Sequence, residues 1–298
     1  MKQIILGLIS FLLFSDNAVR AIQINEYDPQ RHDRFLSGTN RENPSFFAAG
    51  YDFSGVGWNS VNSNQCVTMV SPLHFVGANH YRIPVGSNVL FVNREGMLKS
   101  YTVAGYDELT SVDGSGQTQT ADLVLGRLAA AISAVDDIAF YRVLDTDLSF
   151  YVGKEFLPYG WTHRVGRDTF GGANDRFALA NSGANNATVS MVYDYHKVNT
   201  SAYPDEAGLQ GGDSGSPTLM AWNNELTVLG THFAVDDSNP TYRLNIDSFL
   251  PYYIPQLNAK MAPSGYSIST LAVVPEPASI VLFLSGLIGI AFRSRRSS

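Results

Sequence analysis

Hydrophobic residues in the central part of the chain occur in short runs, and glycine, asparagine or proline residues separate one run from the next. Many runs are rich in β-branched and aromatic residues, which favour strands. Short strands separated by turn residues at this spacing are typical of β-sandwiches and β-barrels rather than of alternating β-α units. The pattern therefore predicts an all-β fold. Examples of such runs are residues 66–70, 88–92, 123–125, 187–193 and 226–233.

Helical patterns are rare in the same region. The alanine-rich stretch 128–134 predicts one helical turn, and residues 246–257 predict a helix that closes the domain. Pro251 and Pro255 lie inside this second stretch, although proline is tolerated only in the first turn of a helix. We find no internal repeat, so we expect one large domain, or two small fused ones, over residues 22–262.

The first residues of the chain have the pattern of an export signal. Met1 and Lys2 precede an apolar run over residues 4–14, and the small residues in 18–21 suit cleavage by signal peptidase after Ala21. Residues 1–21 are therefore predicted to be a signal peptide, and the mature protein is expected to leave the cytoplasm.

The last residues carry three features in a fixed order. Pro-Glu-Pro at 275–277 precedes an apolar segment at 278–292, which is followed by Arg293, Arg295 and Arg296. The apolar segment has about 15 residues, fewer than the roughly 20 that span a bilayer comfortably, but flanking arginines can extend its reach. Positive charge after an apolar helix stays in the cytoplasm, so the domain before it faces outward.

This tail resembles the PEP-CTERM sorting signal of Gram-negative bacteria. The resemblance implies that residues 274–298 form a hydrophobic sorting helix with a basic tail. It also implies a membrane-embedded exosortase that recognises Pro-Glu-Pro and removes the helix after transient anchoring in the inner membrane. The alternative is an ordinary C-terminal anchor. Residues 263–273 are small and polar, and they predict a linker to the tail. The processed protein would then be secreted or held in the cell-surface matrix.

Composition excludes several classes of protein. Of 298 residues, 45% are hydrophobic and 16% are charged, which is enough apolar material for a sizeable core. The net charge is −7 and no basic run stands out, so a nucleic-acid partner is not expected. A single cysteine, Cys66, excludes an internal disulfide and a paired-thiol metal site, and we expect it to be a small buried hydrophobic residue.

A glycine-rich segment carries the clearest chemical signal. Residues 211–217 read Gly-Gly-Asp-Ser-Gly-Ser-Pro. Glycine allows unusual backbone dihedrals and a close approach of a substrate carbonyl, as an oxyanion hole built from the N–H groups of Gly212 and Ser214 requires. The Ser214 hydroxyl is a weak nucleophile, so it needs an imidazole base, and that base needs a carboxylate to orient it.

Candidates for the base and the carboxylate lie upstream. His80 ends a β-like run over residues 68–80, whereas the competing His74 lies in the middle of it. Asp122 begins the apolar run Asp-Leu-Val-Leu, and Asp137 begins a second run of the same kind.

At these residues the sequence resembles the chymotrypsin-like serine peptidases. Ala-Asn-His at 78–80 differs in one residue from the family's histidine motif, while Asp-Leu-Val-Leu and Gly-Asp-Ser-Gly match its other two motifs. The order His, Asp, Ser and the spacings of 42 and 92 residues between His80, Asp122 and Ser214 agree with the family's triad. Asp137 lies too close to Ser214 for that pattern, so Asp122 is favoured. The resemblance covers roughly residues 65–257.

The resemblance implies two six-stranded antiparallel β-barrels with the active site between them. It also implies a serine endopeptidase that acts on proteins or peptides and needs no cofactor. Ser214 would attack, His80 would shuttle the proton and Asp122 would orient His80. In this family the residue equivalent to Asp213 usually pairs with an N-terminus freed by cleavage. This chain has no Ile-Val-Gly-Gly-like start, and Ile22 is simply the residue that signal cleavage would expose.

Two further positions bear on substrate choice. Gly208 lies at the base of the family's specificity pocket, so no acid is present there to hold a lysine or arginine side chain. His232 lies where the glutamate-specific V8-like branch carries a histidine that binds the acidic side chain, since imidazole can donate to a carboxylate. Cleavage after glutamate is one hypothesis, and a preference for small or apolar residues is the other.

Other functions remain open on the sequence. A catalytically silent surface protein with a peptidase fold could bind extracellular protein or matrix, and a structural matrix protein would rest on the tail alone. The Asp- and Asn-rich loops would suit a calcium ion, but the sequence names no metal ligands. His32, His163 and His196 lie outside every motif, and we expect them to be surface or core histidines.

Overall fold

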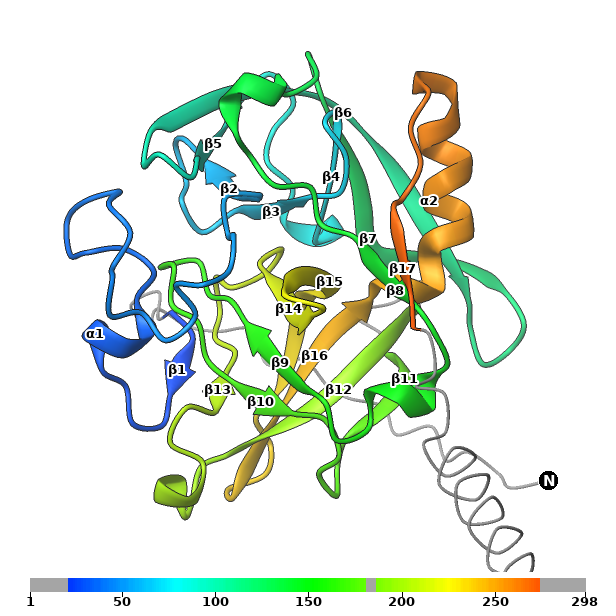
Figure 1. Ribbon diagram of the computed structural model, residues 1–298. Helices are drawn as coiled ribbons and strands as arrows, with labels where there is room; N and C mark the ends of the chain where they lie inside the picture. Colours follow the sequence, from blue (N-terminus) through cyan, green and yellow to red (C-terminus); the bar gives the residue numbers. More distant parts are fainter. Residues whose placement is uncertain (1–20, 181–185, 274–298) are drawn as a thin grey trace, which may run out of the picture.

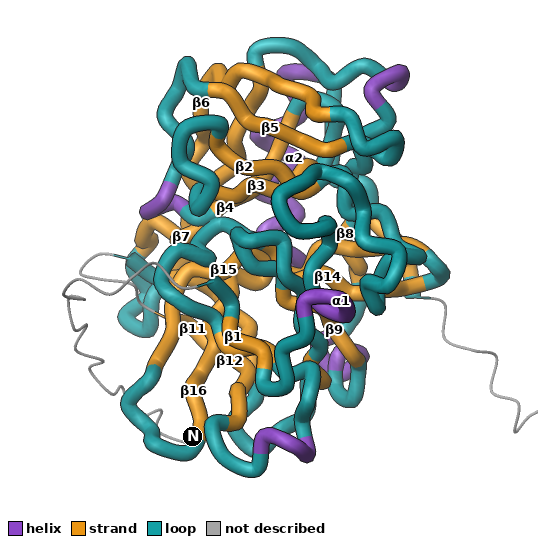
Figure 2. Tube along the Cα trace, turned by 90° about the vertical axis from the view of Figure 1, so that its left-hand side faces the viewer, coloured by secondary structure: helices purple, strands orange, loops and turns teal. Residues whose placement is uncertain are grey.

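The computed structural model describes residues 21–180 and 186–273. It is mostly β, which confirms the predicted fold class, and its strands form two large units, one above the other in Figures 1 and 2. The upper unit comes from the first half of the chain and the lower unit mainly from the second half.

Six strands of the upper unit pair in a cycle, in the order β2-β3-β4-β7-β6-β5, and β5 pairs back with β2 to close a barrel. Its interior is filled by apolar side chains that include the rings of Phe75 and Phe91. Gly126 and Gly57 face these rings. A Cβ at Gly126 would lie 2.0 Å from the Phe75 ring, and a Cβ at Gly57 would lie 2.4 Å from the Phe91 ring. The barrel strands are β2 (Val56–Asn59), β3 (Cys66–Met69), β4 (His74–Gly77), β5 (Asn88–Val92), β6 (Leu98–Val112) and β7 (Thr118–Leu128).

The lower unit is a seven-stranded antiparallel sheet in the order β10-β9-β14-β15-β16-β12-β11. The expectation of a second six-stranded barrel is therefore wrong for this unit. Among the described residues, the outermost strands β10 and β11 pair only with β9 and β12, so the sheet stays open at both edges. The strands are β9 (Glu155–Pro158), β10 (Asp168–Thr169), β11 (Arg176–Ala180), β12 (Thr188–His196), β14 (Pro217–Trp222), β15 (Glu225–Asp236) and β16 (Tyr242–Phe249).

Short elements complete the fold. β1 (Gln23–Ile24) pairs antiparallel with β13 (Ala207–Gly208), and β8 (Val143–Asp145) pairs parallel with β17 (Thr270–Ala272). The remaining elements are α1 (Pro29–His32), α2 (Ile254–Met261) and the 3₁₀ helices η1 (Asn79–Tyr81), η2 (Ala134–Asp136), η3 (Leu148–Tyr151), η4 (Thr200–Ala202), η5 (Leu250–Tyr253) and η6 (Ala262–Ser264).

Both helix predictions need correction. The C-terminal helix α2 begins at Ile254 rather than at residue 246, because residues 246–249 continue β16. Pro251 and Pro255 each lie in the first turn of a short helix, where the missing N–H has no intrahelical partner to lose. The stretch 128–134 does not form a helical turn: Leu128 ends β7, and Ala134 only begins the 3₁₀ helix η2.

The two large units share one apolar core, which also includes α2. Val76 and Leu125 of the barrel pack in the same cluster as Leu219 and Val228 of the sheet and Leu257 of the helix. Because this core joins the two units, residues at the ends of barrel strands are held at defined distances from loops of the sheet.

The predicted signal peptide and sorting helix lie outside the described residues, apart from Ala21. Over residues 21–180 and 186–273, no helix is both long and apolar enough to cross a bilayer. Part of the predicted linker 263–273 is packed on the domain, since Ile268 is buried in the shared core and β17 pairs with β8. The domain boundaries themselves stay predictions.

Candidate active site

His80 and Asp122 lie where two neighbouring barrel strands meet the sheet. β4 pairs antiparallel with β7, and His80 follows β4 in the 3₁₀ helix η1. The backbone N–H of His80 donates to Asp122 Oδ1 at 3.0 Å, and His80 Nδ1 lies 2.8 Å from Asp122 Oδ2. The carboxylate can only accept, so Nδ1 carries the hydrogen and Nε2 presents its lone pair. The imidazole is therefore fixed in the tautomer of a base.

Asp122 is held from both units. Its side chain is 1% exposed, while that of His80 is 43% exposed. The Asp122 N–H donates to Thr188 Oγ1 at 2.7 Å, and its carbonyl accepts from Ser248 Oγ at 2.8 Å. Thr188 and Ser248 belong to strands of the sheet, so the carboxylate is positioned by both halves of the fold.

Ser214 completes the arrangement from a tight loop after β13. Its Oγ lies 3.1 Å from His80 Nε2. Gly212 and Gly215 have φ values of 105° and 88°, which favour glycine. A Cβ at Gly215 would lie 2.5 Å from the carbonyl oxygen of Cys66, so the loop approaches the barrel backbone as only glycine allows. The structure thus brings together Ser214, His80 and Asp122.

The N–H groups of the Ser214 loop fall into two kinds, those that donate within the loop and the two that were expected to form an oxyanion hole. The neighbouring N–H groups of Asp213, Gly215 and Ser216 donate to backbone carbonyls. Within the part of the chain that the structure describes, the N–H groups of Gly212 and Ser214 have no acceptor. Their role as an oxyanion hole stays a prediction.

Asp213 lies buried beneath this loop. Its carboxylate accepts from the backbone N–H groups of Gln210 at 2.8 Å and Trp161 at 3.2 Å, and the backbone N–H of Ile22 lies near enough to lower the pKa of Asp213. Burial raises the pKa of Asp213 to about 6, although His232 and the backbone donors act in the opposite direction. Gly160 makes room for the contact, because a Cβ there would lie 2.5 Å from the Ile22 side chain. The sequence had left open how this carboxylate is satisfied.

The two residues predicted to bind substrate lie in the interior. His232 Nδ1 lies 2.6 Å from Asp247 Oδ1, and Nε2 lies 3.1 Å from the Tyr159 carbonyl oxygen. Both ring nitrogens are thus engaged by the protein itself. A Cβ on Gly208 would lie 2.7 Å from the Tyr195 ring, so this position has no room for any side chain. Substrate binding by His232 and Gly208 stays a prediction, and these contacts give it no support.

The competing candidates lie elsewhere. Asp137 is half-exposed at the C-cap of η2, where it lies 3.8 Å from Arg94. His74 is buried, with its ring nitrogens 2.9 and 3.1 Å from the hydroxyls of Ser71 and Ser264. Burial lowers the pKa of His74, which favours its neutral form in the core.

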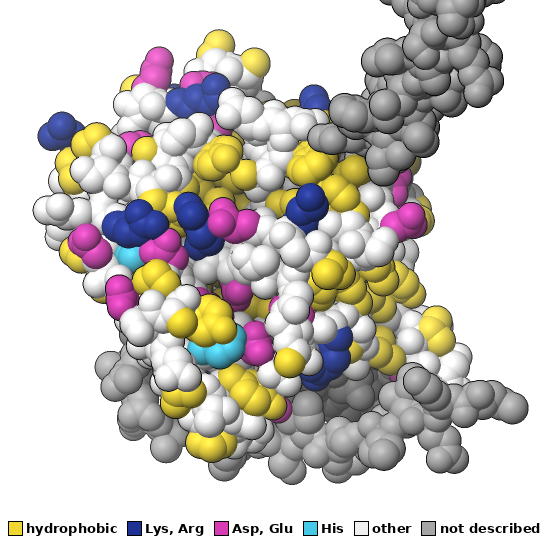
Figure 3. Space-filling view, turned by 60° about the horizontal axis from the view of Figure 1, so that its bottom comes forward, with side chains coloured by type: hydrophobic (Ala, Val, Ile, Leu, Met, Phe, Trp, Pro, Cys, Tyr) yellow, Lys and Arg dark blue, Asp and Glu magenta, His cyan; other side chains and the backbone are white. Residues whose placement is uncertain are grey.

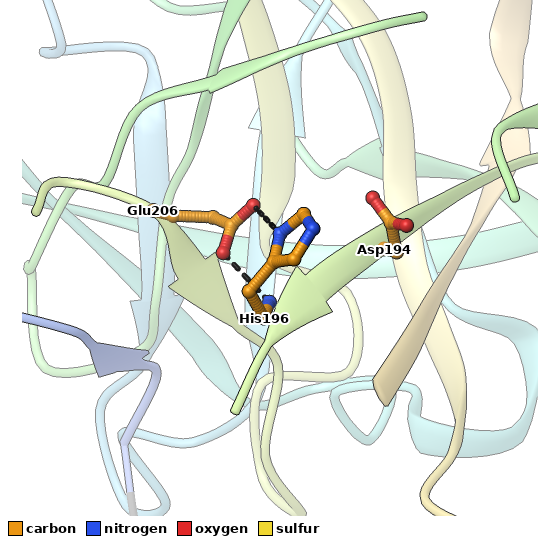
Figure 4. A group of neighbouring side chains, drawn as sticks. All are labelled: Asp194, His196 and Glu206. Atoms are coloured by element: carbon orange, nitrogen blue, oxygen red, sulfur yellow. Dashed lines mark hydrogen bonds and ion pairs between the residues drawn. The ribbon is translucent and has the colours of Figure 1, made fainter. Parts of the chain in front are cut away.

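A second group of ionisable side chains has no counterpart in the sequence analysis. Asp194, His196 and Glu206 gather at one end of the sheet, and one potential ligand atom of each lies within 4.8 Å of the others (Figure 4). Asp194 and His196 are two residues apart on β12, so they share one face of the strand, which is a signal that the sequence contains. Glu206 could not be assigned to them from sequence, because it arrives from a separate loop.

Comparison with known families gives one match, the PEP-CTERM protein-sorting motif, over residues 273–296. The match confirms the interpretation of the C-terminal tail. It identifies an exported protein of Gram-negative bacteria that is anchored in the membrane before an exosortase processes it. No curated protein matches the chain.

Proposed function

We propose that the protein is an exported serine endopeptidase that hydrolyses peptide bonds through Ser214, His80 and Asp122. The observation that carries the proposal is the continuous hydrogen-bonded path from Asp122 Oδ2 through the His80 ring to Ser214 Oγ, with distances of 2.8 and 3.1 Å. A nucleophile, a base within hydrogen-bond reach and a group that orients the base are what acyl transfer by serine requires.

The reaction follows from the geometry. Ser214 Oγ attacks the substrate carbonyl carbon while its proton passes to His80 Nε2, and buried Asp122 stabilises the imidazolium that forms. The N–H groups of Gly212 and Ser214 donate to the oxyanion of the tetrahedral intermediate. The C–N bond then breaks, and His80 gives its proton to the leaving amine. Water, deprotonated by His80, hydrolyses the acyl-enzyme and releases Ser214.

Export and activation are linked in this proposal through Ile22. Resemblance to the chymotrypsin-like family implies that Asp213 pairs with a free N-terminus. The contact between the Ile22 backbone nitrogen and buried Asp213 supports the same arrangement here. Cleavage after Ala21 would convert that amide into an ammonium group beside the carboxylate. Signal peptidase would then supply the charge that keeps the loop of Ser214 ordered.

The preference of the enzyme is proposed to be for small or apolar side chains. Gly208 carries no acid, which disfavours lysine and arginine. His232 is fully engaged by Asp247 and Tyr159, which disfavours recognition of glutamate. Peptide-library profiling would test the preference, and enrichment of glutamate at the cleaved position would contradict it.

A covalent probe tests the enzyme and the nucleophile together. Exported protein is purified and treated with a fluorophosphonate, and hydrolysis of casein is measured in parallel. We expect stoichiometric labelling at Ser214 and loss of both labelling and hydrolysis in Ser214→Ala. Ser238→Ala is the matched control, because Ser238 lies exposed in the loop between β15 and β16, where its backbone N–H donates to Asp236. A wild-type protein that neither labels nor cleaves would instead be a catalytically silent binding protein.

A further inference from the structure

The carboxylates of Asp194 and Glu206 are buried on either side of one imidazole. Asp194 is 7% exposed and Glu206 is 5% exposed, although both carry polar side chains that usually face water. His196 lies between them at the end of β12 (Figure 4). On the face of the molecule shown in Figure 3, histidine side chains border acidic and hydrophobic ones.

Glu206 holds the His196 ring in one orientation. Its Oε1 lies 2.8 Å from His196 Nδ1, and its Oε2 accepts the backbone N–H of His196 at 2.7 Å. The ring also stacks on Tyr203, with centroids 4.0 Å apart and planes 6° from parallel. Because Nδ1 donates to the carboxylate, Nε2 presents a lone pair. Figure 4 shows this second ring nitrogen facing Asp194.

The space between His196 and Asp194 is open to a further ligand, and it is slightly wider than the spacing of two ligands on one metal ion. Among the described residues, the His196 ring forms an ion pair with Glu206, and none within 4.0 Å with Asp194. The ligand atoms nevertheless lie within 4.8 Å of one another. Bonds of roughly 2.0–2.2 Å in a tetrahedron place two ligand atoms about 3.4 Å apart, so the side chains of His196 and Asp194 would move closer together when Zn²⁺ binds. A histidine whose other nitrogen donates to a carboxylate is the usual arrangement at such sites.

Asp168 supplies an independent observation. Its Oδ2 is buried and has no hydrogen-bond partner among the residues that the structure describes, and Asp168 lines the same pocket as Asp194, His196 and Glu206. A buried acceptor left unsatisfied costs about 1–3 kcal/mol, and more when it is charged. The pocket thus brings several carboxyl groups together around one unsatisfied oxygen, and Arg167 is also part of its lining.

We propose that this pocket binds a Zn²⁺-type metal ion, with His196 Nε2 and an Asp194 oxygen as direct ligands. Glu206 sets the tautomer of the imidazole, and Asp168 adds a further carboxylate at the site. Imidazole nitrogen is a ligand for Zn²⁺, whereas Ca²⁺ and Mg²⁺ take oxygen ligands, so His196 favours zinc. The remaining coordination positions would be filled by water.

The metal would stabilise the fold and would take no part in the reaction. Asp194 and His196 belong to β12, whereas Glu206 leads directly into β13 and then into the loop that carries Ser214. The Asn25 N–H also donates to the Glu206 carbonyl oxygen at 3.2 Å, which ties in the segment after Ile22. Over residues 21–180 and 186–273, none of the three cluster residues forms a hydrogen bond or ion pair with His80, Asp122 or Ser214. The site is therefore independent of the proposed peptidase activity.

Metal binding itself is the test. Tag-free exported protein is stripped with a chelator, and Zn²⁺ and Ca²⁺ are titrated separately by calorimetry, with Co²⁺ absorption reporting the ligand field. We expect one Zn²⁺ per chain and a rise in Tm, since a ligand at 100 times its Kd stabilises by about 2.7 kcal/mol. No zinc binding, or binding of calcium alone, would overturn the proposal.

Variants locate the ion. His196→Ala and Asp194→Asn are expected to abolish zinc binding, while Glu206→Gln, which can still accept from Nδ1, should weaken it by about 10–100-fold. Asp113→Asn is the matched control, because Asp113 is a partly exposed acid whose side chain bonds only within the hairpin of β6 and β7. Circular dichroism verifies that each variant folds. If His196→Ala does not fold, His196→Gln is measured in its place. Unchanged zinc affinity in the folded His196 variants would sink the assignment.

Discussion

Two histidine–carboxylate pairs in this molecule have the same residue types and nearly the same geometry, yet different surroundings. His80 meets Asp122 at 2.8 Å, and His232 meets Asp247 at 2.6 Å, each through Nδ1. The His80 side chain is 43% exposed and its Nε2 faces the Ser214 hydroxyl. The His232 side chain is 2% exposed and its Nε2 faces a backbone carbonyl.

The partner at Nε2 decides what each imidazole can do. A hydroxyl can donate or accept, so His80 is free to take a proton from Ser214 and return it. A carbonyl can only accept, so His232 donates from both nitrogens and is held as an imidazolium. Burial alone would lower the pKa of His232, but the negative charge of Asp247, their hydrogen bond and Asp213 raise it above its usual value. One pair is suited to proton transfer and the other to holding the interior together.

Removing the exposed imidazole should have the largest effect. In His80→Ala we expect kcat for casein or a peptide substrate to fall by about 10⁶-fold, as for other serine peptidases that lose the base. The free energy of unfolding in urea should change by less than about 1 kcal/mol, because the His80 side chain is half-exposed. Steady-state kinetics and denaturation curves measure the two effects. Residual activity above about 1% would contradict the role given to His80.

Neutralising Asp247 in the buried pair should mainly reduce stability, whereas removing His80 should mainly reduce activity. Asp247→Asn leaves the His232 imidazolium unpaired in the interior, so the free energy of unfolding should fall by about 3–5 kcal/mol. Denaturation in urea measures the loss. Glu225→Gln is the control, because Glu225 and Arg142 form an exposed pair at 3.4 Å whose loss should cost less than about 1 kcal/mol. Equal losses in the two variants would show that burial does not distinguish these pairs.

A third test concerns the charge beside Asp213. Protein that begins at Ile22 is compared with the same protein carrying two additional residues, Met-Ala, before Ile22. The extension keeps an N–H at Ile22 but removes the ammonium group, so we expect kcat/KM to fall by about 100-fold, the equivalent of about 3 kcal/mol for one lost partner of a buried pair. N-terminal sequencing verifies both forms. Equal activity would mean that the loop of Ser214 is ordered without this charge.

Cys66 should show the smallest effect, although it carries a nucleophilic group next to the loop of Ser214. It is buried, and burial raises the pKa of its thiol to about 12, so almost no thiolate forms near pH 8. We expect no reaction of the folded protein with a thiol-specific reagent over an hour, and complete reaction in guanidinium. Rapid labelling of the folded protein would show that its environment is more open than the structure indicates.

Local motifs were enough to predict the residues that the structure brings together at the candidate site. His80, Asp122 and Ser214 each lie in a short segment whose neighbours, small residues or an apolar strand, carry the signal. The C-terminal motif was equally readable, because its three parts are contiguous in the chain. The all-β class followed from strand patterns that need no tertiary information.

The tertiary structure alone decided matters that depend on distant contacts. His232 looked like a substrate-binding residue, but Asp247 and the Tyr159 carbonyl enclose it from other strands. Pairing across the second unit produced an open sheet of seven strands where a six-stranded barrel was expected. The approach of Ile22 to Asp213 and of Glu206 to His196 likewise joins segments far apart in the chain. Burial and charge pairing arise from packing between such segments. Neighbours in sequence therefore determine the local structure of a residue, whereas neighbours in space determine its chemistry.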